Sequence, residues 1–417
     1  MAGPIPSVES PILSLERIRS QFPALERRHH GQAVAYFDGP GGTQVPGTVA
    51  EAVADYLCHH NANTHWNYPT SAETDRTIDA ARETLGDFLN ARPNEIVFGP
   101  NTTTLLYHLS RALGRQLAPG DEILTTELEH HANMGPWQAL ARERGVRLQV
   151  ARMIRETGVL DWKDFESKVT SKTRLLTIGA ASNALGTIND VRRAGRLARQ
   201  AGAFFLVDAV HFAPHELIDV QELDCDFLTC SAYKFYGPHL GVFFGKKHLL
   251  ESFDFPKLQP APDAAPERVE TGTQNHEGIV GTTAAVEFLA ALAPGENRRT
   301  RLRAGFAALG KAGSALFRQL WQGLEAIPEV RLYGPPPDAP RTPTVSFTVR
   351  GIPSSVVATR LAERGLFCSH GDFYAMTVAE RMGVGAEGFV RAGCACYTTA
   401  EEIQRLLDAL RDGIRGS

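Results

Sequence analysis

A lysine follows a predicted strand at the place where α/β proteins hold reactive groups. Lys234 lies in the stretch SAYKFYGP (231–238), and a Gly-Pro turn comes shortly after it. Open α/β sheets bind ligands beyond the carboxyl ends of their strands, so the amine of this lysine is a candidate for chemistry. Taken alone, the pattern fits a surface lysine as well.

An aspartate 26 residues before Lys234 gives that lysine a possible companion. Asp208 ends the apolar run FLV (205–207), which predicts a buried strand with the carboxylate at its carboxyl tip. Such a carboxylate suits a cationic ring nitrogen, and pyridoxal phosphate needs one to keep its pyridine protonated as an electron sink. On local grounds a helix N-cap after the strand explains Asp208 equally well.

Two further segments suit the other parts of that cofactor. Thr102 and Thr103 open a predicted helix after the turn GPN (99–101), so free N–H groups and hydroxyls there could hold a phosphate. Plain N-capping is the alternative for both threonines. His130, in EHHAN (129–133), could stack on a flat ring, or could be a solvated loop residue. The adjacent histidines lack the spacing of a zinc site, so we expect no metal.

The elements around these residues alternate in type. We predict strands at Glu95–Phe98, Glu122–Thr125, Leu148–Arg152, Leu175–Gly179, Phe204–Asp208, Phe227–Cys230 and Val242–Phe244. We predict helices at Thr74–Leu89, Thr102–Arg115, Pro136–Gly145, Asp161–Val169 and Val191–Ala201. Strands separated by helices form right-handed crossovers, so the fold class is α/β with a mostly parallel sheet covered on both faces.

A second pattern begins after the long predicted helix at Arg298–Leu324. Strands are expected at Val330–Tyr333, Thr344–Val349, Leu366–His370 and Phe389–Cys394, and helices at Ser354–Arg364 and Ala400–Arg411. We therefore predict a large domain over 36–295, a smaller α+β domain over 296–417, and an N-terminal segment, 1–35, packing on the smaller one.

Composition excludes several classes of protein. The formal net charge is −4 with no basic block, so we expect neither nucleic acid nor a membrane surface as a partner. Residues 1–13 carry three prolines and no apolar stretch, unlike a signal peptide. The six cysteines form no CxxC pair, which is typical of free thiols in a reducing compartment. We expect a cytoplasmic protein.

Taken in order, the motifs resemble those of the class V aminotransferase superfamily. The matching segments are YFD (36–38), NTT (101–103), EHHAN (129–133), SNALGT (182–187), DAVH (208–211), SAYKFYGP (231–238) and ETGTQN (270–275). The likeness covers about residues 34 to 412 and is greatest to cysteine desulfurases and selenocysteine lyases; kynureninase and isopenicillin epimerase are more distant. It implies pyridoxal phosphate and the fold type I of such enzymes, with a seven-stranded sheet.

The resemblance also implies roles around the cofactor ring. Lys234 matches the lysine that forms the Schiff base and later moves protons, and Asp208 the partner of the pyridine nitrogen. His130 matches the imidazole stacked on the ring. Asn183 and His211 match positions near the phenolic oxygen, where desulfurases carry glutamine and kynureninase-like members carry histidine.

The remaining matches concern the phosphate and the substrate. Thr103, Ser231 and Tyr233 match phosphate ligands, Tyr233 standing where desulfurases have histidine. Thr273 matches a phosphate ligand from the neighbouring subunit, which implies a homodimer with shared active sites. Arg391 matches the arginine that binds the α-carboxylate of an amino-acid substrate as a bidentate pair.

The likeness fails at the residue that carries sulfur in desulfurases. Aligning Gly365 and Gly371 with that loop places Tyr374 at the catalytic cysteine and Ser369 at the loop arginine. A tyrosine cannot accept sulfur, so Tyr374 is expected to act as an acid or base, to line the substrate pocket, or simply to pack. Cys368 lies six residues upstream, inside a predicted strand.

We therefore expect a lyase that acts on an amino acid through an external aldimine, most simply by β-elimination across a C–S bond, since elimination needs no thiol nucleophile. A desulfurase using Cys368 is the nearest alternative. An epimerase, an aminotransferase or a kynureninase-like enzyme would share the first steps. A non-catalytic partner subunit is the remaining class, and the sulfur acceptor is unknown.

Overall fold

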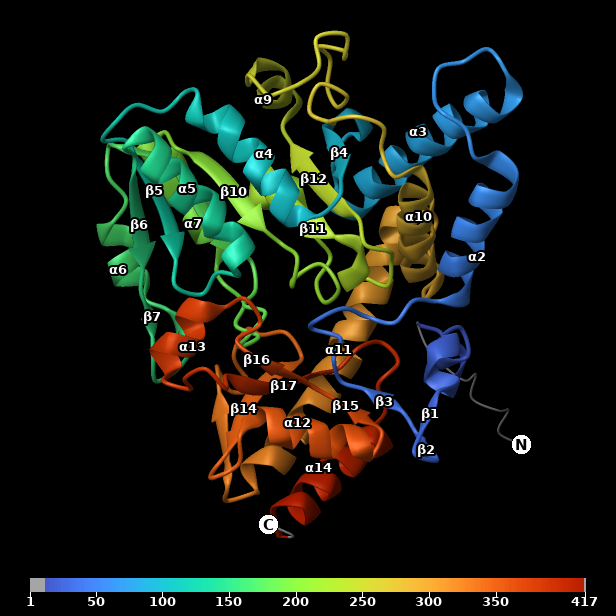
Figure 1. The fold of residues 1–417 in the computed structure, drawn as a ribbon, viewed down its shortest axis with the longest axis vertical. Coiled ribbons are helices and arrows are strands. Elements are labelled where there is room, and N and C mark those ends of the chain that lie inside the picture. Colours follow the sequence, from blue (N-terminus) through green and yellow to red (C-terminus); the bar gives the residue numbers. More distant parts are fainter. Residues whose placement is uncertain (1–11, 416–417) are drawn as a thin grey trace, which may run out of the picture.

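The structure is a computed structural model that describes residues 12–415, so the first eleven residues of the predicted N-terminal segment lie outside the described residues (Figure 1). Its large sheet has seven strands in the order β4-β12-β11-β10-β9-β5-β6. They are β4 (Ile96–Gly99), β12 (Gly241–Gly245), β11 (Phe227–Ser231), β10 (Phe204–Asp208), β9 (Thr173–Gly179), β5 (Glu122–Thr126) and β6 (Arg147–Ala151). Within it β12 pairs antiparallel with both neighbours, and the pairs from β11 to β6 are parallel. The predicted α/β class with a mostly parallel sheet is confirmed.

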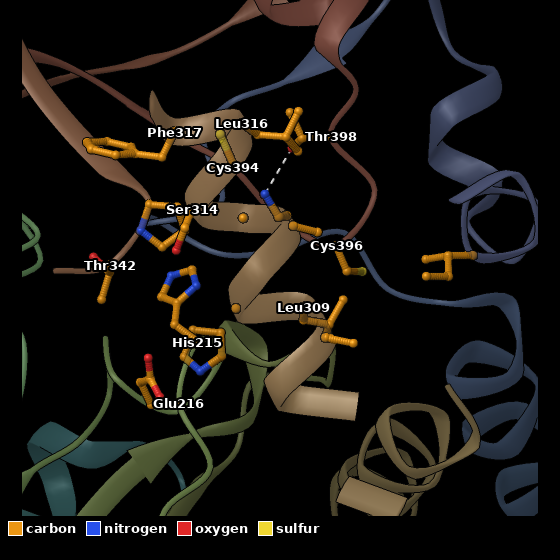
Figure 2. Close-up of a pocket in the computed structure, with 18 of the residues that line it drawn as sticks. His215, Glu216, Leu309, Ser314, Leu316, Phe317, Thr342, Cys394, Cys396 and Thr398 are labelled. Atoms are coloured by element: carbon orange, nitrogen blue, oxygen red, sulfur yellow. Dashed lines mark hydrogen bonds between the residues drawn. The ribbon is translucent and has the colours of Figure 1, made fainter. Parts of the chain in front are cut away.

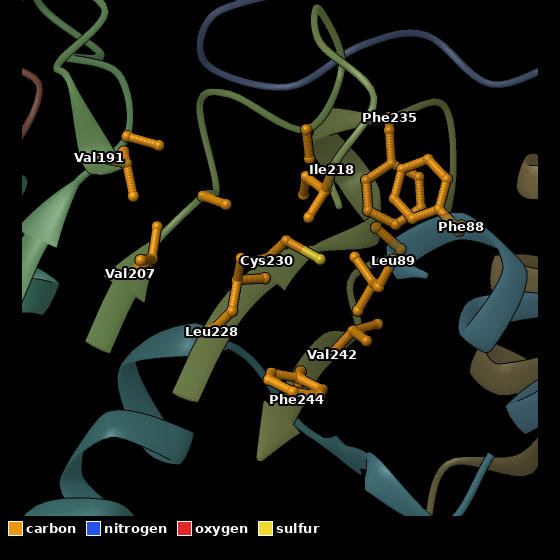
Figure 3. Packing of buried hydrophobic residues seen from close by; sticks show 14 of the residues in the cluster. Phe88, Leu89, Val191, Val207, Ile218, Leu228, Cys230, Phe235, Val242 and Phe244 are labelled. Atoms are coloured by element: carbon orange, nitrogen blue, oxygen red, sulfur yellow. The ribbon is translucent and has the colours of Figure 1, made fainter. Parts of the chain in front are cut away.

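Helices cover both faces of this sheet. The principal ones are α2 (Gly47–Asp55), α3 (Pro69–Leu89), α4 (Thr102–Gly114), α5 (Gly135–Arg144), α7 (Val191–Ala201) and α10 (His276–Ala291). Along β10, Phe205 and Val207 join one hydrophobic cluster while Leu206 joins another on the opposite face, which is why the strand is an unbroken apolar run. Figure 3 shows Val207 among buried side chains of neighbouring strands.

A second sheet forms the core of what we call the C-terminal unit. Its strands run in the order β13-β14-β17-β16, all antiparallel. The elements of this unit are α11 (Arg298–Glu325), β13 (Val330–Tyr333), β14 (Thr344–Val349), α12 (Ser354–Glu363), β16 (Ser369–Gly371), α13 (Met376–Met382), β17 (Phe389–Gly393) and α14 (Ala400–Arg415). Figure 1 shows this unit, in orange and red, beneath the seven-stranded sheet.

The single strand predicted at Leu366–His370 is wrong. The chain forms β15 (Leu366–Phe367), which pairs in parallel with β3 (Ala35–Tyr36), and then changes partner to form β16 against β17. Cys368 lies between the two strands rather than inside one. The partner of β15 is a strand from the N-terminal segment, and no local pattern indicates such a distant pairing.

The described part of the N-terminal segment contacts both a helix of the large domain and the C-terminal unit. Phe22 packs edge-on against Phe288 of α10 (5.4 Å between centroids) and against Tyr397 of the C-terminal unit (4.9 Å). Arg19 forms an ion pair with Glu402 at 2.9 Å. The domain boundaries at 35 and 295 remain our proposal.

The shorter elements complete the chain. They are α1 (Leu15–Arg19), η1 (Pro23–Glu26), β1 (Arg28–His29), β2 (Gln32–Ala33), η2 (Tyr56–His60), η3 (Pro93–Glu95), η4 (His131–Asn133), β7 (Met153–Ile154), β8 (Val159–Leu160), α6 (Trp162–Ser167), α8 (Val220–Leu223), η5 (Ala232–Lys234) and α9 (Lys247–Ser252). Within residues 12–415, no helix combines the length and apolarity needed to cross a membrane.

A turn after β9 joins the large sheet to the C-terminal unit. Four successive carbonyls of residues 183–186 accept hydrogen bonds from that unit: Asn183 O from Arg391 Nη1 (2.9 Å), Ala184 O from Ser346 Oγ (2.5 Å), Leu185 O from Arg341 Nη2 (3.1 Å) and Gly186 O from Thr342 N (2.8 Å). Buried carbonyls need partners, so these bonds hold the two parts of the molecule in one alignment. We call residues 183–186 the carbonyl turn.

We expect Gly186→Ala to destabilise the protein more than Gly202→Ala. Both glycines have positive φ (77° and 67°), so each alanine is forced into the left-handed region at about 1–2 kcal/mol. A Cβ at residue 186 would also lie 2.7 Å from Thr344 O, whereas a Cβ at residue 202 would meet nothing within 4 Å. Urea unfolding should show an additional loss of about 1–3 kcal/mol for Gly186→Ala. Equal losses would contradict the tight fit of the carbonyl turn.

Candidate active site

An enclosed pocket of about 80 Å³ lies at the carboxyl edge of the large sheet. It gathers nine of the ten predicted cofactor residues: Thr102, Thr103, His130, Asn183, Asp208, His211, Ser231, Tyr233 and Lys234. Most of them lie at or just beyond the carboxyl ends of β5, β9, β10 and β11, which are adjacent and parallel in the sheet. Parallel strands bring their carboxyl ends to one edge, so segments distant in sequence converge there.

Two buried groups of opposite charge face this pocket. The Lys234 amine donates to the carbonyls of Pro40 and Gly41, and burial, reinforced by the nearby Arg391 charge, lowers its pKa to about 7. Asp208 accepts from Val210 N at 2.9 Å and forms no ion pair with any described residue. Burial raises the pKa of the Asp208 carboxyl to about 6. A buried carboxylate without a cation partner fits a protonated ring nitrogen.

His130 lies at the entrance to the pocket in a defined tautomer. Its Nδ1 accepts a hydrogen bond from Ala132 N at 3.0 Å, so the proton of the neutral ring is on Nε2. Burial is the main cause that lowers the pKa of His130 to about 4. The imidazole is therefore neutral at physiological pH, which suits stacking on an aromatic ring.

Glu129 anchors the loop that carries His130, a role that the sequence prediction missed. Its buried carboxylate accepts from Thr126 Oγ1 (2.7 Å), Asn133 Nδ2 (2.7 Å) and Gly179 N (2.9 Å). Burial raises the pKa of Glu129 to about 7 despite these bonds. Glu129 directly precedes His130 in the EHHAN motif, so a carboxylate beside a candidate histidine was the available signal.

Two buried polar atoms in the pocket lack partners among the described residues: Asn183 Oδ1 and His211 Nδ1. The other nitrogen of His211, Nε2, lies 3.1 Å from Thr342 Oγ1 and 3.2 Å from Thr344 Oγ1. Unpaired buried polar atoms are costly, so they mark where a polar ligand atom fits. Their place agrees with a phenolic oxygen between the two side chains.

The beginning of α4 fits an anion. Asn101 is the N-cap, its Oδ1 accepting from Thr104 N, so the alternative that Thr102 or Thr103 caps the helix is wrong. Thr102 Oγ1 is turned inward to Ser231 Oγ at 2.9 Å, whereas Thr103 is exposed at the pocket. The free N–H groups of the first turn favour negative charge there.

A wider outer pocket continues from the enclosed one and adds Tyr374 and Arg391 to the residues it shares with it. Arg391 is buried, and burial lowers its pKa to about 9, although it stays charged near pH 7. Neither its Nε nor its Nη2 donates to another described residue, which leaves one edge of the guanidinium open. That edge fits a carboxylate as a bidentate pair.

Tyr374 lies at the rim of the outer pocket and does not line the enclosed one. Its side chain is the most exposed large hydrophobic one at the site, at 71%, and its ring centroid is 5.6 Å from that of His130. Thr273 is the one predicted cofactor residue outside both pockets; it lies in a separate groove with Trp66 and Leu258.

None of the six cysteines lines either pocket. Cys368 is the nearest in sequence to the rim, and burial raises the pKa of its thiol far above the usual value. A thiol in that state stays protonated and is a poor nucleophile.

A further cavity is lined in part by Thr342, whose hydroxyl contacts His211. Figure 2 shows His215, Leu309, Phe317 and Cys396 around it, and its volume is about 230 Å³. None of the predicted site residues lines this cavity.

Residues 35–406 match the class V aminotransferase family. The chain is 35% identical over 413 residues to a cysteine desulfurase from Pectobacterium carotovorum, covering 95% of this chain and 97% of that one. It is 34% identical over 405 residues to a probable cysteine desulfurase from Synechocystis, covering 95% of each.

Solved structures agree with these relatives. The apo structure of a cysteine desulfurase from Thermococcus onnurineus superposes with a TM-score of 0.87 and 30% identity, covering 96% of this chain and 98% of that one. An Escherichia coli cysteine desulfurase gives 0.83 and 27%, covering 97% and 99%. The resemblance stated from the motifs is confirmed: the chain belongs to the class V aminotransferase family, whose members are pyridoxal-phosphate enzymes of fold type I.

Proposed function

We propose that this chain is a pyridoxal-phosphate lyase that cleaves the C–S bond of cysteine, or of an S-substituted cysteine, by β-elimination. The proposal rests on one observation above the others: no cysteine lines either pocket, and Tyr374, which the motif alignment places at the desulfurase cysteine, lines the outer one. Elimination needs a base, a carboxylate ligand and an electron sink, and residues suited to each lie around the pocket.

When bound, the cofactor supplies the electron sink for charge that develops at the substrate Cα. Asp208 would keep the ring nitrogen protonated through its unpaired carboxylate. Asn183 and His211 would hold the phenolic oxygen, and Thr103, Ser231 and Tyr233 would hold the phosphate. His130 would stack on the ring.

The chain's own groups then act on the amino acid. Arg391 binds the α-carboxylate through its Nε–Nη2 edge. Lys234, whose pKa of about 7 leaves much of the amine neutral, takes the proton from Cα at Nζ. The C–S bond then breaks, and its electron pair leaves with sulfur. The released enamine hydrolyses to pyruvate and ammonia, so the amino-acid skeleton is not recovered.

A cysteine desulfurase that uses Cys368 is the second candidate. The names of the relatives favour it. Against it stand the protonated thiol of Cys368 and its position between β15 and β16, which belong to two different sheets. A kynureninase-like activity is favoured by His211, which stands where kynureninase-like members carry histidine, and no residue of this kind favours an epimerase or an aminotransferase.

We further propose a homodimer whose active sites each take Thr273 from the neighbouring subunit. Thr273 is exposed and lies away from the pocket of its own chain. The segment before it is firmly held, because Arg82 and Glu270 form a buried bidentate ion pair at 2.9 and 3.0 Å. Trp66 and Leu258, 61% and 68% exposed in the same groove, would be covered in such a dimer.

The products distinguish the two candidates. With L-cysteine the enzyme should release sulfide, pyruvate and ammonia in equal amounts, because elimination discards the amino group. Cys368→Ala should keep turnover within about twofold, because the thiol lines neither pocket and its loss removes a single sulfur atom. Alanine as the main product, with a persulfide on Cys368 and loss of turnover in Cys368→Ala, would establish the desulfurase instead.

The reactivity of Lys234 should depend on pH in an unusual range. An unperturbed lysine titrates near ~10.4, but the lowered pKa of about 7 means that the buried amine is neutral above that pH. In cofactor-free protein, acetylation of Lys234 by acetic anhydride should therefore rise through pH 7 and level off by about pH 8.5. Peptide mass mapping measures this, with surface lysines as internal controls. A rise parallel to those controls would contradict the buried amine.

Mixed dimers test the shared site. Thr273→Ala should weaken cofactor binding about tenfold, because a hydrogen bond to a charged phosphate is lost. Pairing a Thr273→Ala subunit with a Lys234→Ala subunit leaves one site with Lys234 from the first and Thr273 from the second. That site should bind the cofactor with normal affinity. If mixing restores nothing, Thr273 does not act across the interface.

A further inference from the structure

The loop from Gly371 to Ala375 crosses the rim of the outer pocket in a fixed position. Asn183 Nδ2 donates to Phe373 O at 2.9 Å, and His131 N donates to Tyr374 O at 2.7 Å. The loop is thus bonded to segments on two sides of the pocket, both of them part of the large sheet's carboxyl edge. It forms a rim that is already in place over the site.

Two successive residues of this loop have a strained backbone. Phe373 and Tyr374 both have φ of 57°, in the left-handed region that non-glycine residues avoid. Each such residue costs about 1–3 kcal/mol and persists only where its surroundings fix it, most often at functional sites. The conformation places the Phe373 side chain inward and leaves Tyr374 exposed.

The inward ring of Phe373 covers one face of the Arg391 guanidinium. The guanidinium carbon lies 3.8 Å from the ring centroid, within the range of a cation–π contact. Asn183 closes a triangle, because its carbonyl accepts from Arg391 Nη1 while its amide donates to Phe373 O. One corner and one face of the guanidinium are therefore held, and the Nε–Nη2 edge stays free.

We propose that Phe373 is a specificity-determining residue that selects α-amino acids over simple amines. Its ring fixes the plane of the Arg391 guanidinium, so that the free edge meets an α-carboxylate in the bidentate geometry. The ring also keeps water from that face, which strengthens the ion pair with the carboxylate. This inference rests on the proposed role of Arg391 in substrate binding.

Glycine at residue 41 agrees with this arrangement. A Cβ there would lie 3.3 Å from Arg391 Nη2. The free edge of the guanidinium therefore has space beside it only because residue 41 carries no side chain. The ring on one face and the open space at the edge together define where a carboxylate can lie.

The test compares two ligands that differ by the α-carboxylate alone. L-alanine and ethylamine are titrated into the holoenzyme, and the absorbance change of the bound cofactor gives each Kd. The ratio of Kd for ethylamine to Kd for alanine measures the contribution of the carboxylate. We expect Phe373→Leu and Phe373→Gly to lower this ratio about tenfold, which is the change in Kd expected when one cation–π contact is lost.

The variants separate recognition from packing. Phe373→Gly removes the ring but also relieves the backbone strain at residue 373. A lowered ratio in this variant therefore cannot be ascribed to a strained or damaged loop. Met376→Ala removes a neighbouring exposed side chain and should leave the ratio unchanged. An unchanged ratio in both Phe373 variants, or an equal weakening of both ligands, would overturn the proposal.

Arg391→Leu distinguishes this inference from the proposed function. It should bring the ratio close to one, because both ligands then lack an ion pair. If the wild-type ratio already equals that of Arg391→Leu, the proposed carboxylate site is wrong, and the role of Phe373 falls with it. If Arg391→Leu lowers the ratio and the Phe373 variants do not, only the role of Phe373 is overturned.

Discussion

The carbonyl turn after β9 is the contact on which the active site depends. The large sheet supplies Asp208 and Lys234, whereas Arg391 comes from the C-terminal unit, and these groups must face one cavity to act on one molecule. Successive carbonyls of a turn point in different directions, so four donors from the other unit fix both its distance and its orientation. Arg391, the proposed carboxylate ligand, is itself one of these donors, so the contact that aligns the two parts of the molecule also positions its guanidinium.

The same geometry explains how the charges are tolerated. Lys234 and Arg391 are both buried, and the Arg391 charge helps to lower the pKa of Lys234. Asp208 partly offsets this by favouring the charged form of Lys234, and Asp38 does the same for Arg391. Burial raises the pKa of Asp38 to about 6. The site thus holds buried charged groups that form no ion pair with one another, and such groups need charged partners. A phosphorylated cofactor and an amino acid carry charges that would pair with them.

Much of the fold could be predicted because its signals are local. The strand at Phe204–Asp208 and the helix at Val191–Ala201 have the predicted bounds. The signals for both lie within the segments themselves, an apolar run for the strand and a capped amphipathic pattern for the helix. The split at Cys368 could not be predicted, because it depends on a partner strand over three hundred residues away. At the site, Lys234, Asp208 and His130 could be named from their places at or after strands, whereas Asn183, His211, Ser231 and Tyr233 came from the family resemblance. Glu129 and Phe373 could not be named, because they act only through neighbours that the fold brings to them.

His211 is held by Thr342 and Thr344, two hydroxyls of the C-terminal unit, although it faces the pocket of the large sheet. The C-terminal unit, which supplies Arg391, thereby also sets the orientation of an imidazole in the pocket of the large sheet. Substitutions at Thr342 or Thr344 therefore act on His211 from a unit to which His211 does not belong. A variant library aimed at the behaviour of this imidazole should include both threonines, although neither lies in the large sheet.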